Sequence, residues 1–270
     1  HHTVRFPPAR VMLGPAWLTA YRGLGILGAF SALSAVLIWP IFGPDYPPGV
    51  DTPTFLHLSW VTKLAVSGNL ANPFSDPYWY GGFPYLEAYP PLGYGLVGTL
   101  SFVTRIDLVI VYTVVLVIAH GGLAAATYWL ALELGVKRWS AVLAGVLAAA
   151  AYPVLASVFL WGWFTSVMAL PLGLAGLLLL EKSLRTGDWK PAAWGGLCMA
   201  GSILTHHMTG LSIGLGMVGW FAYHAATGVY SRRQVALFST LFVAVTALVV
   251  LPWGVPFMLH ILDAGFRREV

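Results

Sequence analysis

Long apolar runs follow one another along most of the chain. Seven of them approach the roughly 20 apolar residues that a membrane-crossing helix needs. They cover residues 24–42, 106–131, 139–158, 164–180, 191–205, 208–226 and 235–256. The pattern predicts an all-α integral membrane protein with about seven transmembrane helices. Another apolar segment, residues 90–104, has only 15 residues. It is either an eighth span or a half-helix that does not cross the membrane.

The composition agrees with a membrane protein and excludes several other classes. Of the 270 residues, 58% are hydrophobic and only 9% are charged, against roughly 25% charged in an ordinary soluble domain. So few charges cannot cover the surface of a soluble globule. A soluble enzyme, an extended nucleic-acid binder and a disordered chain are therefore excluded. The single cysteine, Cys198, permits no disulfide within the chain.

The positions of lysine and arginine predict the orientation of the spans. If segment 90–104 does not cross and the N-terminus is inside, 10 of the 14 basic residues lie in inner segments. These are Arg5, Arg10, Arg22, Lys137, Arg138, Lys182, Arg185, Lys190, Arg232 and Arg233. Cytoplasmic loops carry an excess of such residues. The predicted topology is seven spans with the N-terminus in and the C-terminus out, and the net charge of +4 reflects these inner loops.

The first external loop, residues 43–90, is long and rich in aromatic residues, so we expect it to be folded. Residues 52–67 predict an amphipathic helix that lies in the membrane interface, with an apolar stripe that includes Phe55 and Trp60. Thr52 is its expected N-cap. Gly68 is expected to end it. The loop then leads through a turn-rich aromatic stretch into the half-helix 90–104, and the whole chain 1–270 forms one membrane domain.

Three ionisable residues of this loop are candidates for chemistry. Asp51 is a general base or metal ligand at the water–lipid boundary, or a charge at a helix N-terminus. His57 either converges with Asp51 on one pocket or lies at the level of the lipid headgroups. Glu87 either holds a cation or substrate hydroxyl or is a solvated loop residue. Asp76, in a Ser-Asp-Pro sequence, is expected to form a turn.

Further candidates lie beyond the loop. Arg105 begins the second span on the outer side, where it either binds phosphate or extends to the interface. His206 and His207 lie where two short spans meet, and ionisable groups there are functional candidates. Neighbouring helical residues point about 100° apart, so at most one of these histidines is expected to face a given ligand.

Two other features have simpler interpretations. His120, in the middle of a span, is expected to form a hydrogen bond between helices. Trp161 and Trp163 fit an aromatic belt at the interface, or they stack on a sugar or isoprenoid. The sequence contains no Walker loop, GxSxG, HExxH or CxxC motif.

Taken together, these pieces resemble the polyprenyl-phosphate-dependent membrane glycosyltransferases of the GT-C class. The specific similarity lies in DTPTFLHLSWVTKLAVSGNL and AYPPLGYGL, where an aspartate opens the first external loop and a proline pair begins a short apolar helix. The chain looks most like the group related in name to 6-pyruvoyl-tetrahydropterin synthase. It is more distantly similar to oligosaccharyltransferases and to mannosyl- and aminoarabinose transferases. Relatives usually continue further, so we expect this chain to be the front part of a longer protein.

The resemblance implies an inverting transferase that takes a sugar from a polyprenyl-phosphate donor on the extracytoplasmic side of a prokaryotic plasma membrane. It implies that Asp51 is the catalytic base. The implied substrate-binding residues are His57, Trp79, Tyr80, Glu87, Tyr89, Arg105, His206 and His207. A divalent cation is a candidate cofactor, with Asp51, Glu87 and His57 as candidate ligands. Membrane lipid and partner membrane subunits are the expected partners, and no nucleic acid is expected.

Two alternatives from other functional classes remain. In the first alternative, the chain is a non-catalytic scaffold subunit of a larger complex, and the outer cavity should then be plugged by side chains or partner helices. Otherwise it transports lipid-linked sugars, which requires a cavity that is reachable from the inner side.

Overall fold

The structure is a computed structural model that describes residues 16–43, 47–78 and 84–266. Every secondary-structure element within these ranges is helical. Short 3₁₀ and π segments, η1 and η2, accompany the α-helices. The elements are α1 (Ala16–Leu37), η1 (Trp39–Phe42), α2 (Thr52–Val66), α3 (Tyr85–Ala88), α4 (Leu92–Thr104), α5 (Leu108–Glu133), α6 (Arg138–Ala150), α7 (Tyr152–Ala156), η2 (Ser157–Trp161), α8 (Phe164–Thr186), α9 (Trp189–Thr205), α10 (His207–Thr227) and α11 (Arg232–Phe266).

Helices occupy all seven of the predicted spans, and four helical stretches among the described residues are long and apolar enough to cross a membrane. These are Leu108–Glu133, Arg138–Trp161, Phe164–Thr186 and Arg232–Leu262. The described residues therefore confirm an all-helical fold with four candidate membrane-spanning helices. The number of crossings and their orientation remain predictions.

Two predicted spans have different bounds in the structure. The first, 24–42, ends as an α-helix at Leu37 and continues as the 3₁₀ turn η1, because Pro40 cannot donate a helical hydrogen bond. The third, 139–158, is interrupted at Ala151, whose backbone is extended just before Tyr152-Pro153. Proline disfavours helical backbone in the preceding residues, so the single predicted helix becomes α6, α7 and η2.

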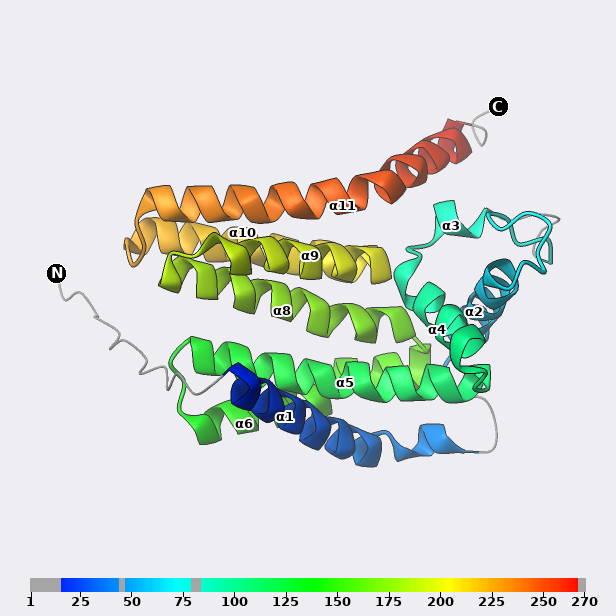
Figure 1. Cartoon of the computed structure of the whole chain (residues 1–270), viewed down its shortest axis with the longest axis horizontal. Coiled ribbons are helices and arrows are strands. Elements are labelled where there is room, and N and C mark those ends of the chain that lie inside the picture. Colours follow the sequence, from blue (N-terminus) through cyan, green and yellow to red (C-terminus); the bar gives the residue numbers. More distant parts are fainter. Residues whose placement is uncertain (1–15, 44–46, 79–83, 267–270) are drawn as a thin grey trace.

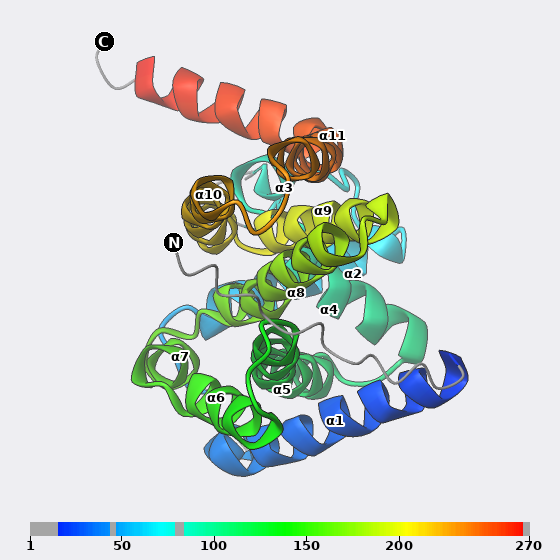
Figure 2. The ribbon, with the colours of Figure 1, turned by 90° about the vertical axis from the view of Figure 1, so that its left-hand side faces the viewer.

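The long helices α5, α8, α9, α10 and α11 run side by side, and α2, α3 and α4 gather at one end of them (Figure 1). Seen along the bundle, α1 and α6 lie against α5 on the side away from α11 (Figure 2). We call residues 47–78 and 84–104 the cap, and the end of the bundle that carries them the cap end. The last turns of α11 diverge from the bundle in both views.

Small residues and one buried histidine join the spanning helices. A Cβ added to Gly121 would overlap the backbone of Ser31 at 2.6 Å, so α1 and α5 approach closely there. The neighbouring His120 is fully buried. Its Nδ1 lies 2.9 Å from the Ser34 hydroxyl and its Nε2 lies 3.0 Å from the Ala149 carbonyl. The predicted hydrogen bond between helices is thus confirmed, and it joins α1, α5 and α6.

Helix α2 and the half-helix 90–104 are found where the sequence placed them, as α2 and α4. The prediction that Thr52 is the N-cap of α2 is wrong. The N-cap is Asp51, and the Thr52 hydroxyl donates to the Pro48 carbonyl at 2.8 Å. The helix ends as expected beside Gly68, whose φ is +75°. The buried face of α2 includes Leu58 and Val61 and is wider than the predicted stripe, because α2 packs directly on α4.

The crossing of α2 and α4 gives a test of the cap. A Cβ added to Gly98 would overlap the Ser59 carbonyl and lie 2.9 Å from Thr62 Cβ, whereas one added to Gly95 meets nothing within 4 Å. Gly98→Ala should therefore lower the free energy of unfolding by about 1–3 kcal/mol through overpacking. Gly95→Ala, on the same helix, should be neutral or stabilising, because alanine has the higher helix propensity. Melting temperatures of the two variants in detergent check this, and equal values would contradict it.

Candidate functional site

Asp51 is held at the start of α2 by contacts with a distant part of the chain. Its backbone N–H donates to the Trp161 carbonyl at 2.8 Å, and that of Val50 donates to the Leu160 carbonyl at 3.2 Å. Its side chain makes no capping bond to α2. Instead, the carboxylate oxygen Oδ2 accepts a hydrogen bond of 3.0 Å from the indole Nε1–H of Trp163. The carboxylate is thus directed toward α8 and is not used as a helix cap.

Two glycines allow this approach. Gly49 and Gly162 both have positive φ, at +117° and +66°. A Cβ on Gly49 would overlap the backbone of Gly162, and a Cβ on Gly162 would lie 2.5 Å from Thr52 Oγ1 and 2.7 Å from Thr52 N. Neither the backbone conformation nor the space accommodates a side chain at these positions. The Asp51 loop and the turn before α8 therefore touch backbone to backbone.

Trp163 also lines an open groove of about 440 Å³ beside α8 and α10. The groove is lined by Trp163, Ser166, Leu170, His206, Met208, Thr209, Ser212 and Ile213. Three of its polar side chains form a chain of hydrogen bonds. Ser166 Oγ lies 2.8 Å from Thr209 Oγ1, which lies 2.8 Å from His206 Nδ1. The groove therefore has a polar strip on walls that are otherwise largely apolar.

His206 is a neutral hydrogen-bonding group in this groove. It lies between α9 and α10, and its Nδ1 accepts from the Thr209 backbone N–H at 3.3 Å, which caps α10. Because Nδ1 is an acceptor, the proton of the neutral ring is on Nε2. Burial and then the adjacent His207 lower the pKa of His206 from 6.5 to about 4. At neutral pH this side chain is therefore a donor through Nε2–H and carries no positive charge.

His207 contacts different elements. Its ring lies 6.5 Å from that of Trp253 and 5.2 Å from that of Phe257, both on α11. Burial lowers its pKa. The indole Nε1–H of Trp253 donates to the Leu86 carbonyl at 2.8 Å, so the same aromatic group fastens α11 to the cap. His206 therefore lines the groove, whereas His207 packs against α11.

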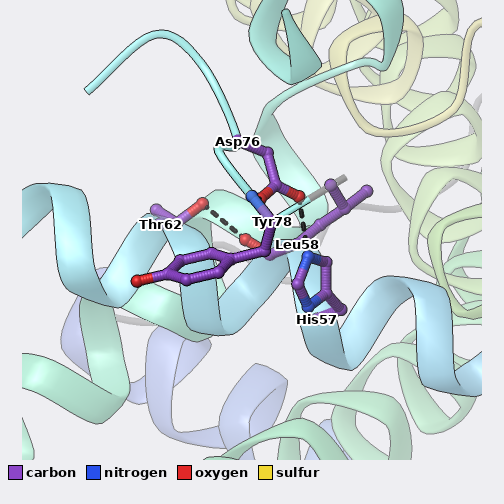
Figure 3. Close-up of polar contacts among 5 residues, drawn as sticks. All are labelled: His57, Leu58, Thr62, Asp76 and Tyr78. Atoms are coloured by element: carbon purple, nitrogen blue, oxygen red, sulfur yellow. Dashed lines mark hydrogen bonds and ion pairs between the residues drawn. The ribbon is translucent and has the colours of Figure 1, made fainter. Parts of the chain in front are cut away.

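His57 pairs with Asp76 inside the cap (Figure 3). His57 Nε2 lies 2.6 Å from Asp76 Oδ2, and Asp76 Oδ1 accepts from the Tyr78 backbone N–H at 2.9 Å. Asp76 is fully buried. The expected turn at Asp76 is present, and the same carboxylate fixes the turn onto α2. Burial raises the pKa of Tyr85, and the negative charge of Asp76 raises it further. The pairing of His57 with Asp51 in one pocket does not occur among the contacts described.

The remaining predicted residues are placed apart from the groove. Glu87 is exposed on α3. Tyr89 packs edge-on against Phe55 with ring centroids 6.4 Å apart. Arg105 is exposed and ends α4 in left-handed backbone. It is ~18 Å along the helix, at 1.5 Å per residue, from Gly93, where α4 contacts α8 and α9. Trp79 and Tyr80 lie outside the described residues.

No group of three or more His, Cys, Asp or Glu in the described ranges is arranged to hold a metal ion. The three candidate ligands are separated in their contacts, since Asp51 bonds Trp163, His57 bonds Asp76 and Glu87 is exposed.

Two groups of polar residues were not predicted from the sequence. Ser166 and Thr209 gave no signal, because hydroxyls are common in membrane helices. At the end opposite the cap, the buried Glu181 accepts from Tyr230 at 2.7 Å and from Trp220 at 3.2 Å, and lies 3.2 Å from His224. An acidic residue in an apolar helix is a signal that could have identified this cluster. Glu181 lies ~17 Å along α8 from Leu170 in the groove, at 1.5 Å per residue.

The glycine contact beside Asp51 can be tested with a matched pair. Gly162→Ala combines left-handed backbone with overlap on Thr52, whereas Gly68→Ala has the same sign of φ and open space. Gly68→Ala should cost about 1 kcal/mol from the backbone alone. Gly162→Ala should cost about 1–3 kcal/mol more. Thermal unfolding of both variants measures this difference, and equal costs would show that the contact is not tight.

The pKa of His206 predicts a loss of stability in acid. Between pH 6.5 and about 4 the unfolded chain binds a proton at this residue and the folded chain does not, so stability falls as pH falls through that window. Asparagine is a good N-cap that does not titrate. The His206→Asn variant should therefore lose less melting temperature than wild type between pH 7 and pH 5. An equal loss in both proteins would contradict the assignment.

No protein-family model matches the chain, and no curated protein is significantly similar to it.

Proposed function

We propose that this protein is a membrane glycosyltransferase that moves a sugar from a polyprenyl-phosphate donor to an acceptor at the cap end, which faces the extracytoplasmic side. The observation that carries the proposal is the position of Asp51. Its carboxylate is bonded to Trp163, and Trp163 lines an open groove that contains hydrogen-bonding side chains. The apolar helices below it would give a lipid-linked donor lateral access from the bilayer.

In the proposed reaction Asp51 is the general base. An acceptor hydroxyl oxygen attacks the anomeric carbon of the sugar from the face opposite the phosphate. The carboxylate takes the hydroxyl proton as the new glycosidic bond forms. The bond between the anomeric carbon and the phosphate oxygen breaks, and its electron pair leaves with the polyprenyl phosphate. The anomeric configuration is therefore inverted.

The departing phosphate gains negative charge, and the groove offers hydrogen-bond donors for it. His206 supplies a neutral Nε2–H at the N-terminus of α10, where the helix dipole also favours an anion. Ser166 and Thr209 extend the polar strip. Arg105 lies at the far end of α4, so in this arrangement His206 is the phosphate contact nearest to Asp51.

The scaffold alternative is favoured less by the same geometry. A scaffold has no need of an open groove with a polar strip beside a carboxylate, and the groove is not plugged by side chains of the described residues. The transporter alternative needs a polar path from the opposite end. Within the bundle at that end, Glu181 and His224 are each only 4% exposed, and His224 is packed against the rings of Trp220 and Tyr230.

Asp51→Asn tests the proposal. Asparagine keeps an oxygen that can accept from Trp163, so the variant should fold and bind lipid, but it cannot take a proton. We expect transfer to fall by at least about a hundredfold, as for the loss of a general base. The assay follows release of polyprenyl phosphate by mass spectrometry from a panel of polyprenyl-phosphate hexoses offered to protein in lipid nanodiscs.

Asp107→Asn is the matched control. Asp107 caps α5 through the Val109 backbone N–H at 2.8 Å, a role that asparagine also fills, so this variant should retain wild-type transfer. Wild-type turnover by Asp51→Asn would sink the base assignment. A wild-type protein that neither transfers sugar nor retains polyprenyl phosphate through purification would overturn the proposed function as a whole.

A further inference from the structure

The backbone around Trp163 holds its side chain at a defined place on the rim of the groove. The Trp163 N–H donates to the Ser157 carbonyl at 2.8 Å, closing the π turn η2, and the next N–H donates to the Gly162 carbonyl at 2.8 Å. Trp163 is then the N-cap residue of α8, with φ −77° and ψ 59°. Its position is therefore fixed by two hydrogen-bonded turns and by the left-handed Gly162.

The indole ring makes two different contacts. One face region stacks on Trp161, with ring centroids 5.6 Å apart and an angle of 25° between the planes. The Nε1–H donates to Asp51 Oδ2 at 3.0 Å. Although the Trp163 side chain is 42% exposed, its only strongly polar atom is directed at the carboxylate. A belt tryptophan would instead direct this N–H to the lipid headgroups.

We propose that Trp163 is a positioning residue for the proposed transferase reaction, and this inference rests on the proposed function. Its indole N–H occupies Asp51 Oδ2 and fixes the plane of the carboxylate. Oδ1 is left to take the proton of the acceptor hydroxyl. A carboxylate at a partly exposed site without such a donor rotates among several orientations, and a general base must lie within hydrogen-bond reach of its proton.

Trp163 has a second effect on the geometry of the site. Because its ring lines the groove as well as bonding Asp51, it sets the distance between the base and the wall that carries His206 and Ser166. An error in the position of the base is costly in rate and has little effect on ground-state binding. A role in positioning therefore predicts an effect on kcat with little change in KM.

Trp163→Phe separates positioning from packing, because phenylalanine retains an aromatic ring and removes only the donor. Hydrogen bonds to charged groups contribute enough that kcat should fall roughly ten- to a hundredfold, with KM within about twofold. Trp194→Phe is the matched control, since Trp194 is 63% exposed on α9 and does not line the groove. It should leave both constants within about twofold of wild type.

A second readout does not depend on turnover. In protein with ¹⁵N-labelled tryptophan, the indole N–H resonance that disappears in Trp163→Phe identifies Trp163. That resonance should move upfield in Asp51→Asn, because a hydrogen bond to a charged acceptor is replaced by one to a neutral amide. It should stay within the wild-type range in Asp107→Asn.

The outcomes separate this inference from the proposed function. If Asp51→Asn abolishes transfer but Trp163→Phe keeps wild-type kcat, the proposed function stands and the positioning role is overturned. An unchanged Trp163 resonance in Asp51→Asn also overturns it. If Asp51→Asn retains wild-type transfer, the base assignment itself fails, and the positioning role fails with it even where the resonance moves. A shifted resonance together with a kcat loss in Trp163→Phe that is absent from the control tryptophan variant supports the inference.

Discussion

Asp51 and Trp163 are 112 positions apart in the chain, and the contact between Gly49 and Gly162 brings them together. Both glycines have a positive φ, and neither has room for a Cβ. The two backbones therefore approach closely enough for the N–H groups of Val50 and Asp51 to donate to the Leu160 and Trp161 carbonyls. Everything proposed for the site depends on this contact, because it directs the carboxylate to α8. Without it, Asp51 would be one more acidic residue before a helix.

The cap is held in place by several polar contacts that act in different directions. The bond between the half-buried His57 and the buried Asp76 fixes the loop after α2 onto that helix. The bond from Trp253 to the Leu86 carbonyl fastens the other side of the cap to α11. The free energy of unfolding falls when one partner of such a polar contact is removed, so these contacts favour a single arrangement of the cap. The groove is positioned between a fixed cap and a fixed bundle.

The structure changes the chemistry that the paired histidines suggest. From the sequence alone, both are ionisable candidates for binding substrate. In the fold, His206 accepts the Thr209 N–H and is held neutral by burial, while His207 packs among the aromatic rings of α11. One residue is thus a neutral donor and helix cap, and the other is an element of packing. Stabilisation of an anion in this groove would rely on oriented dipoles rather than on a cation.

The sequence by itself determined the class of the protein, the places of its long helices, the cap helices α2 and α4, the turn at Asp76 and the hydrogen bond role of His120. Each follows from local information, namely the length and period of an apolar run, a proline or glycine at its end, or a polar group with no water within reach. Only the tertiary structure decided that Asp51 meets Trp163 and that His57 meets Asp76. Such pairs depend on which backbones can approach across more than a dozen residues of intervening chain, and hydrophobic periodicity carries no information about that. Side-chain protonation was likewise undetermined, because the burial that lowers the pKa of His206 arises only when α8, α9 and α10 pack together.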